Sequence, residues 1–350
     1  MVFRSDPVLR RGARDRRAGT GATLALLTGI LVTAACNPAG PAAPSGSSAS
    51  DASAAARPVH LYTSVTQATV DAVVTLFGQV HPDITVEVFR APTGELNARI
   101  AAERREGRLG ADLLWLTDPL SMQPYATEGL LAPWTPAESA AVKAGLHTDL
   151  FWGTRILSMV LVRQKGETGP MDWADLAQPA YRDSVAIPDP GFAGSAFGAL
   201  GYFGLNDAYG IDYYRRLKAN GAIQVRSPDD VVTGVAEGRL KAGMTLDSSA
   251  RTAVAKGSPI ELVWPASGAI AMYSPIAIVK ENDAGAAAQA FADFLLTKPA
   301  QEAIAGSGWQ PVRDDVAGPP IDGSQVTVDW DAAYRRQAEL LEEYRSVFGG

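Results

Sequence analysis

The chain has 350 residues, a formal net charge of −7 at pH 7 and a single cysteine. One cysteine excludes disulfide bonds within the chain, so the folded part must be held together by its hydrophobic core. The acidic balance, and the lack of basic clusters after the N-terminal segment, give the protein no electrostatic basis for binding nucleic acid.

The N-terminal 35 residues have the pattern of an export signal. Six arginines begin it, the uncharged run AGTGATLALLTGILVT follows, and Ala34 and Ala35 precede the cysteine, Cys36. This pattern is typical of secretory signals, and the run is shorter than the ~20 residues of a membrane-spanning helix. We therefore expect residues 1–35 to be a signal peptide, with twin-arginine export as an alternative route. This segment contains six Arg and two Asp, so its removal would change the net charge of the chain from −7 to −11.

The segment that follows, residues 36–57, is rich in Ala, Ser, Pro and Gly and has no large apolar side chain. Such a composition cannot bury enough surface to offset the entropy of ordering, so we expect a flexible spacer. At ~100–200 residues per domain, the remaining length fits two lobes. We place one lobe at residues 58–160 plus 272–350 and the other at residues 161–271.

From residue 58 onward, short apolar strands alternate with helices of about ten to fifteen residues, a pattern that predicts βαβ units and mostly parallel sheets. Two long apolar segments, GTRILSMVLVRQ and AIAMYSPIAIVK, are expected to cross between the lobes, and Pro119 is expected to begin a further helix. Strands are predicted at 59–64, 84–91, 111–118, 184–189, 222–227, 241–249 and 260–265, and helices at 67–83, 93–108, 194–204, 207–221, 228–238, 284–296 and 330–348.

The chain lacks the local motifs of catalytic and metal sites. His60, His81 and His147 lie in different segments, and there is no nucleophile elbow, phosphate loop or Cys/His zinc spacing. We therefore expect no enzyme activity, no metal and no cofactor. The enzyme alternative would need an acid–base pair, which a close approach of Asp118 and Asp247 would supply.

Polar residues recur where predicted strands end and helices begin, which is where open α/β sheets bind ligands. Each one alone is explained by helix capping, since Ser, Thr and Asp are preferred caps. Their recurrence at the same end of successive strands predicts a shared ligand site. The residues are Thr63, Ser64, Thr93, Gly94, Thr117, Asp118, Asp247 and Ser248.

The segment PDPGFAGSAFGALGYF carries the sharpest indication of ligand chemistry. Gly194, Ser195 and Ala196 lead into a predicted helix, where free backbone N–H groups and the helix dipole favour an anion. The alternative is that these small residues only allow close packing of the helix on the sheet.

The order of these segments resembles bacterial extracellular solute-binding proteins of ABC importers, in the group that carries ferric iron, 2-aminoethylphosphonate or thiamine. The resemblance runs from VHLYTS through GADLLWLTDPLSMQPYATEGLLAPWTP and DPGFAGSA to AIAGSGWQPVR. It implies an α/β fold of the two-lobed type II periplasmic-binding kind, with a mostly parallel sheet in each lobe and two crossover strands. A small solute would be held in the interlobe cleft and delivered by a monomer to a permease and its ATPase.

The cysteine after the signal resembles a bacterial lipobox. The resemblance implies that Cys36 carries a lipid that holds the protein at the outer face of the cytoplasmic membrane, and that the protein has no other membrane contact. Plain secretion is the alternative for this segment. Ligand sensing for a sensor kinase is the alternative to transport.

The resemblance also narrows the ligand. Ferric-binding members use adjacent tyrosines where this chain has Asp247, Ser248 and Ser249, whereas the pair Tyr213-Tyr214 lies in a predicted helix. A zwitterion with a phosphonate or phosphate end is therefore expected. Its anion would bind the amides of Ser195 and Ala196, helped by Thr63 or Ser64, its ammonium would pair with Asp118 or Asp247, and Tyr273 would close one wall. Iron held by carboxylates and an exogenous anion remains the alternative.

Overall fold

The computed structural model describes residues 57–349, which belong to one compact unit. The expected signal peptide, Cys36 and nearly all of the expected spacer lie outside the described residues. The strands are β1 (Val59–Thr63), β2 (Val86–Arg90), β3 (Leu113–Trp115), β4 (Leu131–Ala132), β5 (Trp152–Gln164), β6 (Val185–Pro188), β7 (Ile223–Val225), β8 (Ala242–Leu246), β9 (Ile260–Val263), β10 (Ala269–Val279), β11 (Gln310–Pro311) and β12 (Gln325–Thr327). The helices are α1 (Gln67–Val80), α2 (Thr93–Arg105), α3 (Pro119–Thr127), α4 (Gly194–Leu205), α5 (Gly210–Ala219), α6 (Pro228–Ala236), α7 (Asp247–Ala255), α8 (Ala286–Phe294), α9 (Lys298–Gly306) and α10 (Trp330–Phe348).

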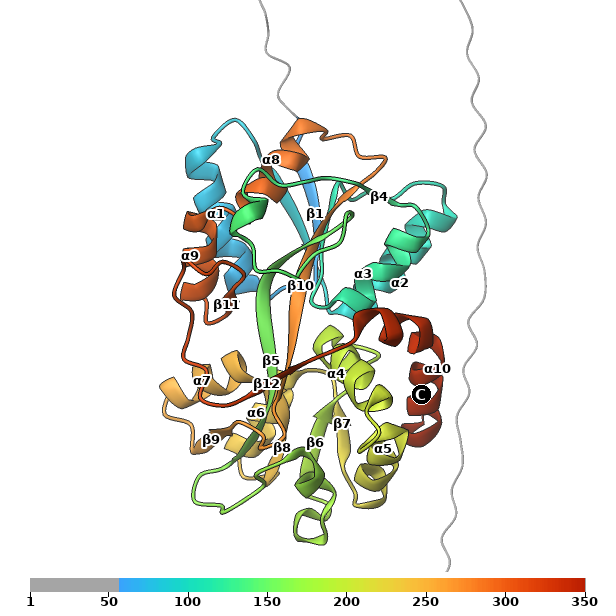
Figure 1. The fold of residues 1–350 in the computed structure, drawn as a ribbon, viewed down its shortest axis with the longest axis vertical. Coiled ribbons are helices and arrows are strands. Elements are labelled where there is room, and N and C mark those ends of the chain that lie inside the picture. Colours follow the sequence, from blue (N-terminus) through green and yellow to red (C-terminus); the bar gives the residue numbers. More distant parts are fainter. Residues whose placement is uncertain (1–56, 350) are drawn as a thin grey trace, which may run out of the picture. The chain divides into compact units, whose positions relative to one another are not determined.

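The main sheet runs in the order β2-β1-β3-β10-β5-β8-β6-β7, and two long strands divide it between two lobes (Figure 1). In the first lobe β1 pairs in parallel with β2 and β3, and in the second β6 pairs in parallel with β7 and β8. The strands β5 and β10 run antiparallel through both lobes, with β10 pairing with β3 and β5 with β8. The predicted α/β fold, with two lobes and two crossover strands, is confirmed. The predicted lobe boundaries fall inside β5 and β10 and stay a prediction.

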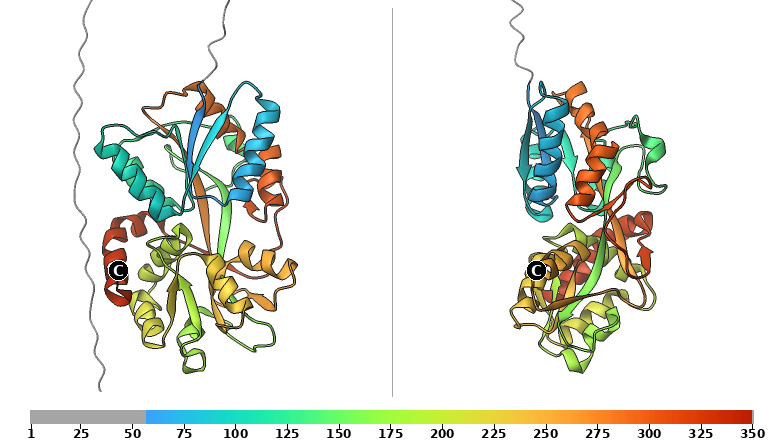
Figure 2. Two further views of the ribbon diagram at one scale, coloured as in Figure 1. Left: turned by 180° about the vertical axis from the view of Figure 1, so that it is seen from behind. Right: turned by 90° about the vertical axis from the view of Figure 1, so that its left-hand side faces the viewer.

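Helix α1 shows how apolar spacing places the helices on the sheet. Val70, Val73 and Phe77 follow one another at intervals of three and four, so they share one buried face. The ring of Phe77 lies 5.0 Å from Phe291 and 5.3 Å from Phe294 of α8. Burying each such side chain contributes about 1.5–3 kcal/mol. This packing holds α1 beside α8 in the first lobe (Figure 2).

The C-terminal helix α10 packs along α4 and α5 of the second lobe and also touches α3 of the first (Figure 1). Gly204 of α4 allows the close approach, because a Cβ there would lie 2.4 Å from Cδ2 of Leu340. The hydroxyls of Tyr334 in α10 and Thr127 in α3 lie 2.8 Å apart. The predicted packing helix therefore connects both lobes. No helix in residues 57–349 is long and apolar enough to cross a membrane.

The short strands β4, β11 and β12 were not predicted, and two longer segments also differ from the predicted elements. The strand expected over residues 241–249 ends at Leu246, and Asp247–Ala255 forms α7, in which the N-terminal Asp247 suits the helix dipole. Helix α9 was not predicted, although Pro299 stands in its first turn, where proline is tolerated. Asp247 and Ser248 therefore begin a helix that directly follows the strand.

Candidate ligand-binding site

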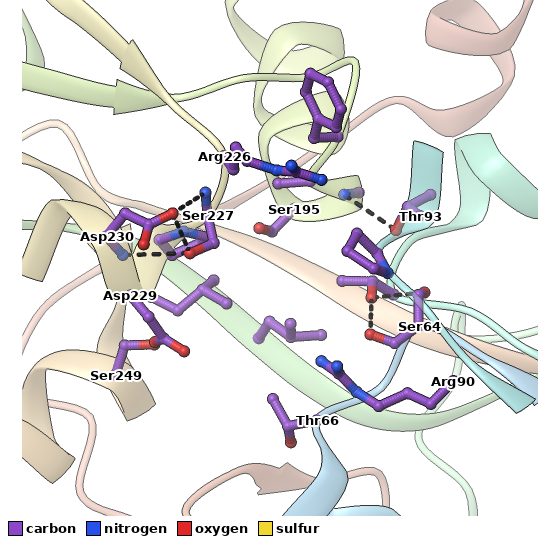
Figure 3. A pocket seen from close by; sticks show the side chains of 18 of the residues that line it. Ser64, Thr66, Arg90, Thr93, Ser195, Arg226, Ser227, Asp229, Asp230 and Ser249 are labelled. Atoms are coloured by element: carbon purple, nitrogen blue, oxygen red, sulfur yellow. Dashed lines mark hydrogen bonds between the residues drawn. The ribbon is translucent and has the colours of Figure 1, made fainter. Parts of the chain in front are cut away.

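A cavity of about 360 Å³ lies where the two lobes meet beside the crossover strand β5 (Figure 3). Hydroxyl and charged side chains from both lobes face it, as expected of a cleft that encloses a polar solute. The polar lining residues are Ser64, Thr66, Arg90, Thr93 and Thr117 of the first lobe, Arg155 of β5, and Ser195, Arg226, Ser227, Asp229, Asp230 and Ser249 of the second lobe. Trp309, which follows α9, also lines the cavity.

Part of the predicted site lines this cavity, namely Ser64, Thr93, Thr117, Gly194 and Ser195. Ser64 follows β1 and Thr117 follows β3, and these neighbouring parallel strands end at the same edge of the sheet. The hydroxyl oxygens of Ser64 and Thr117 accordingly lie 2.9 Å apart. Residues that are far apart in the chain are thus neighbours in the fold because the strands that precede them end at the same edge of the sheet.

Other predicted residues are turned into the protein. The hydroxyl of Thr63 donates to the carbonyl of Trp115 at 2.7 Å, so it serves the β1–β3 contact. The ring of Tyr273 packs edge-on against Trp330, 6.0 Å away. The predicted residues outside the cavity lining are Thr63, Gly94, Asp118, Ala196, Asp247, Ser248 and Tyr273.

The two aspartates expected to bind an ammonium group are occupied elsewhere. Asp118 caps α3, where its carboxylate accepts the backbone N–H of Ser121 at 2.9 Å and the hydroxyl of the same residue at 2.7 Å. Asp247 forms an ion pair with Arg251 one turn further along α7. Burial raises the pKa of Asp118 to about 7 and also raises the pKa of Asp247. Neither carboxylate faces the cavity or contacts the other.

The N-terminus of α4 is open toward the cavity. Its N-cap residue, Ala193, has no side chain that can cap the helix. The amide of Gly194 donates to the hydroxyl of Thr93 across the cleft at 3.2 Å. The next two amides, of Ser195 and Ala196, have no hydrogen-bond acceptor in residues 57–349. Two donors and the helix dipole therefore remain for an anion.

Arg155 is the most unusual side chain of the cavity. It is 1% exposed, yet no carboxylate in the described part of the chain pairs with it. Its Nε donates to the hydroxyl of Ser274 at 2.9 Å, and its guanidinium lies 4.1 Å from the ring centre of Trp309. Nη1 has no partner within residues 57–349. Burial, together with the charge of Arg90, lowers the pKa of Arg155 to about 9.

Two further arginines face the same cavity from opposite lobes. Arg90, at the end of β2, donates from Nε to the carbonyl of Val65 at 2.9 Å. Arg226 forms an ion pair with Glu95 of the first lobe, and its guanidinium lies 4.9 Å from the ring centre of Phe192. Three arginines therefore line the cavity, although the chain as a whole is acidic.

These arginines were not predicted as site residues, because none of them belongs to a local sequence motif. One signal was present: Arg155 interrupts the apolar segment GTRILSMVLV, and charged residues are almost never buried in a strand unless they have a partner. A buried cation without a carboxylate partner would have indicated an anion site. That inference needs the burial of Arg155, which the sequence alone does not give.

The opposite wall is acidic and comes from the first turn of α6. Asp230 completes a capping box with Ser227: the Ser227 hydroxyl accepts the Asp230 amide at 3.2 Å, and the Asp230 carboxylate accepts the Ser227 amide at 3.0 Å. Asp229, the preceding residue, is exposed at the cavity wall. Figure 3 shows it beside Ser249, across the cavity from Arg90.

A second cavity of about 530 Å³ continues from the first. The two share Thr66, Asp229, Ser249 and Trp309 in their linings. Ser248, one of the predicted site residues, lines this second cavity, and its buried hydroxyl has no partner in the described region.

The arrangement offers no preformed metal centre. The described residues contain no group of three or more His, Cys, Asp or Glu side chains that could hold a metal ion. Tyr213 and Tyr214 are buried in the packing of α5, where the hydroxyl of Tyr213 donates to the carbonyl of Trp173 at 2.7 Å. This agrees with their expected role as packing residues.

Comparisons with known proteins agree with this geometry. A family model described as "Bacterial extracellular solute-binding protein" matches residues 59–310. The sulfate-binding protein of Synechocystis sp. is 21% identical over 254 residues, which cover 67% of this chain and 69% of that protein.

Two solved structures share the fold. AfuA from Actinobacillus pleuropneumoniae, with exogenous fructose-6-phosphate bound, has a TM-score of 0.75 and 19% identity, and the alignment covers 83% of this chain and 98% of AfuA. Iron-bound HitA from Pseudomonas aeruginosa has a TM-score of 0.73 and 21% identity, with coverage of 83% and 99%.

Proposed function

Because the chain belongs to the family of bacterial extracellular solute-binding proteins, we propose that it captures an anionic solute between its lobes and delivers it to an ABC permease with its ATPase. The proposed cargo is a small phosphonate such as 2-aminoethylphosphonate. The protein works as a monomer, and a lipid on Cys36 holds it at the outer face of the cytoplasmic membrane.

The observation that carries the proposal is the buried, unpaired guanidinium of Arg155. Removing a charge from water costs several kcal/mol unless an opposite charge and hydrogen bonds compensate. Residues 57–349 supply Arg155 with a hydroxyl and an aromatic face but no carboxylate. A bound anion supplies the missing charge.

The other donors around Arg155 suit an oxyanion with several oxygens. The amides of Ser195 and Ala196 lie in the first turn of α4, and hydrogen bonds from such donors to an ionised acceptor are about twice as strong as neutral ones. Ser64 and Thr117 add hydroxyls from the first lobe. A phosphonate or phosphate group has three terminal oxygens and can bind donors from both lobes, which draws the lobes together.

Two of the proteins compared above support an oxyanion as the ligand class. One is named a sulfate-binding protein, and the structure of AfuA contains a sugar phosphate. Iron is the second candidate, because HitA of the same fold was solved with iron bound. The cavity favours the anion, since its most buried charged group is a cation.

Calorimetric titration with 2-aminoethylphosphonate tests the function, using the wild-type chain and Arg155→Met. Methionine keeps an unbranched side chain against Trp309 but removes the charge. Truncating one partner of a buried charge pair costs about 2–5 kcal/mol, so we expect the affinity to fall by about 30-fold or more. Arg163→Met is the matched control, because Arg163 lies on the same strand but pairs with Glu261 outside the cavity.

Wild-type protein that ignores phosphonates but becomes coloured with ferric citrate would replace the proposed ligand by iron. Equal affinities of wild type and Arg155→Met would contradict the proposed recognition. Thermal unfolding of both variants checks that the fold is intact. Mass spectrometry of the small molecule that copurifies from the native host gives the ligand independently.

A further inference from the structure

The charges that line the cavity without a partner of opposite sign are separated between its walls; Arg226 of the second lobe is paired with Glu95. Arg90 and Arg155 have no carboxylate partner in residues 57–349, and both belong to the wall formed by the first lobe and β5. Asp229 has no cationic partner and no side-chain hydrogen bond within the same residues, and it lies on the opposite wall. An uncompensated cationic wall therefore faces an uncompensated carboxylate across one cavity.

Helix capping does not account for Asp229. The N-terminus of α6 is already capped by the reciprocal hydrogen bonds between Ser227 and Asp230. The helix dipole favours an acidic residue in this turn, and Asp230 supplies one. Asp229 instead stands at the junction of the two cavities, beside Ser249.

The size of the cavity also exceeds what a bare oxyanion needs. A volume of about 360 Å³ lies within the ~300–1,000 Å³ range of sites for small organic ligands. With the anion bound at Arg155 and the α4 amides, space remains toward Asp229 for the rest of the molecule.

We infer that Asp229 binds the cationic end of a zwitterionic ligand, so that the site selects ammonium-bearing phosphonates over phosphonates without an amine. This inference rests on the proposed function and gives the ammonium a partner other than Asp118 and Asp247. Those two carboxylates are already bound to Ser121 and to Arg251. Because Asp229 faces the ligand from the second lobe, its interaction with the ammonium group also favours closure of the cleft.

The decisive experiment compares 2-aminoethylphosphonate with ethylphosphonate, which lacks only the amine, by calorimetry on the full chain. Wild type should prefer 2-aminoethylphosphonate by about tenfold, as for a charge-assisted hydrogen bond. Asp229→Asn should abolish this preference by weakening only the amine-bearing ligand. The preference should decrease at high salt, because an exposed carboxylate is screened.

Asp212→Asn is the matched control. It changes the net charge by the same amount in the same lobe, but Asp212 pairs with Arg215 on α5 and lies outside the cavity lining, so the preference should persist. Equal binding of both ligands by wild type, or equal effects of Asp229→Asn and Asp212→Asn, would overturn the inference and leave anion capture intact. If neither phosphonate binds, the proposed function itself fails.

Discussion

Asp118 is a buried carboxyl group at the contact between the lobes, and its burial disfavours the ionised form. It caps α3, it is fully buried, and its Oδ2 lies so close to α4 that a Cβ on Gly194 would be 2.3 Å from it. Burial opposes the charged form and raises the pKa of Asp118 to about 7, although Ser121 donates two hydrogen bonds. Near neutral pH this carboxyl group is therefore partly protonated.

This shift predicts that the protein becomes less stable as the pH rises from about 4 to 7. Over that range the folded protein keeps a proton on Asp118 that the unfolded chain has lost, so the free energy of unfolding decreases with pH. A shift from 3.8 to about 7 corresponds to about 4 kcal/mol in total. Asp118→Asn should remove this contribution, so the decrease in the free energy of unfolding between pH 4 and 7, measured by urea unfolding, should be smaller than for wild type.

Asp314→Asn is the control for this measurement, because the Asp314 side chain is 85% exposed. It should leave the slope of stability against pH unchanged. A slope for Asp118→Asn that equals the wild-type slope would show that Asp118 ionises normally in the folded protein.

At the scale of single residues, the sequence predicted which residues lie at the cavity better than it predicted which groups their side chains bind. Ser64, Thr93, Thr117 and Ser195 line the cavity because strand ends and helix starts are readable from local patterns. The partner of Asp118 depends on which way its side chain turns at the start of α3. A carboxylate that caps a helix and one that faces a ligand have the same local sequence.

Among the elements, α2 and the loop before α4 form a close contact between the lobes. The amide of Gly94 donates to the carbonyl of Phe192 at 3.3 Å, and a Cβ on Gly94 would lie 2.1 Å from the carbonyl oxygen of Gly191. Glu95 and Arg226 form an ion pair across the same gap. We call these five residues the interlobe seam, and only glycine at position 94 allows it to close this far.

Gly94→Ala should therefore weaken ligand binding without unfolding the protein. Alanine favours the helix by about 1 kcal/mol over glycine, but its methyl group would meet the Gly191 carbonyl in the closed state. Overpacking of this kind costs about 1–3 kcal/mol, or about 5- to 150-fold in affinity. Calorimetry gives the affinity, and small-angle scattering should show a larger radius of gyration with ligand present than for wild type.

Gly78→Ala is the matched control, because Gly78 lies in α1 and a methyl group there would meet no atom of the described chain within 4 Å beyond its own helix. It should keep the wild-type affinity and gain stability. A Gly94→Ala protein that binds as tightly as wild type would show that the seam does not need to close.

The elements themselves were largely predictable, and their junctions were not. Apolar runs such as ADLLWL and the long crossovers follow from burial on both faces of the sheet. The boundary between β8 and α7 was placed too late, because MTLDSS has no breaker between strand and helix. The seam depends on Gly94 meeting the backbone carbonyl of Gly191, about a hundred residues away, and no local pattern connects the two positions.

In the whole molecule, the described part of the chain begins in the first lobe, directly before β1. Arg57, its first residue, pairs with Asp283, which also pairs with Arg108. These side chains are substantially exposed, so each pair contributes little stability, but together they fix where the preceding segment attaches. If a lipid on Cys36 tethers the first lobe as proposed, we expect the second lobe to be the part that moves when the cleft closes on a ligand.

The tether itself is tested by Cys36→Ala. Residues 36–57 are predicted from composition to be a flexible spacer, and a coil of this length has an end-to-end distance of about 25 Å. A lipid on Cys36 would therefore keep the binding lobes within reach of a permease while leaving them free to turn. We expect Cys36→Ala to move the protein from the membrane fraction to the soluble exported fraction, with its calorimetric affinity unchanged. Because a lipid is the only membrane attachment that the sequence predicts, a variant that stays with the membrane would contradict lipid anchoring at this residue.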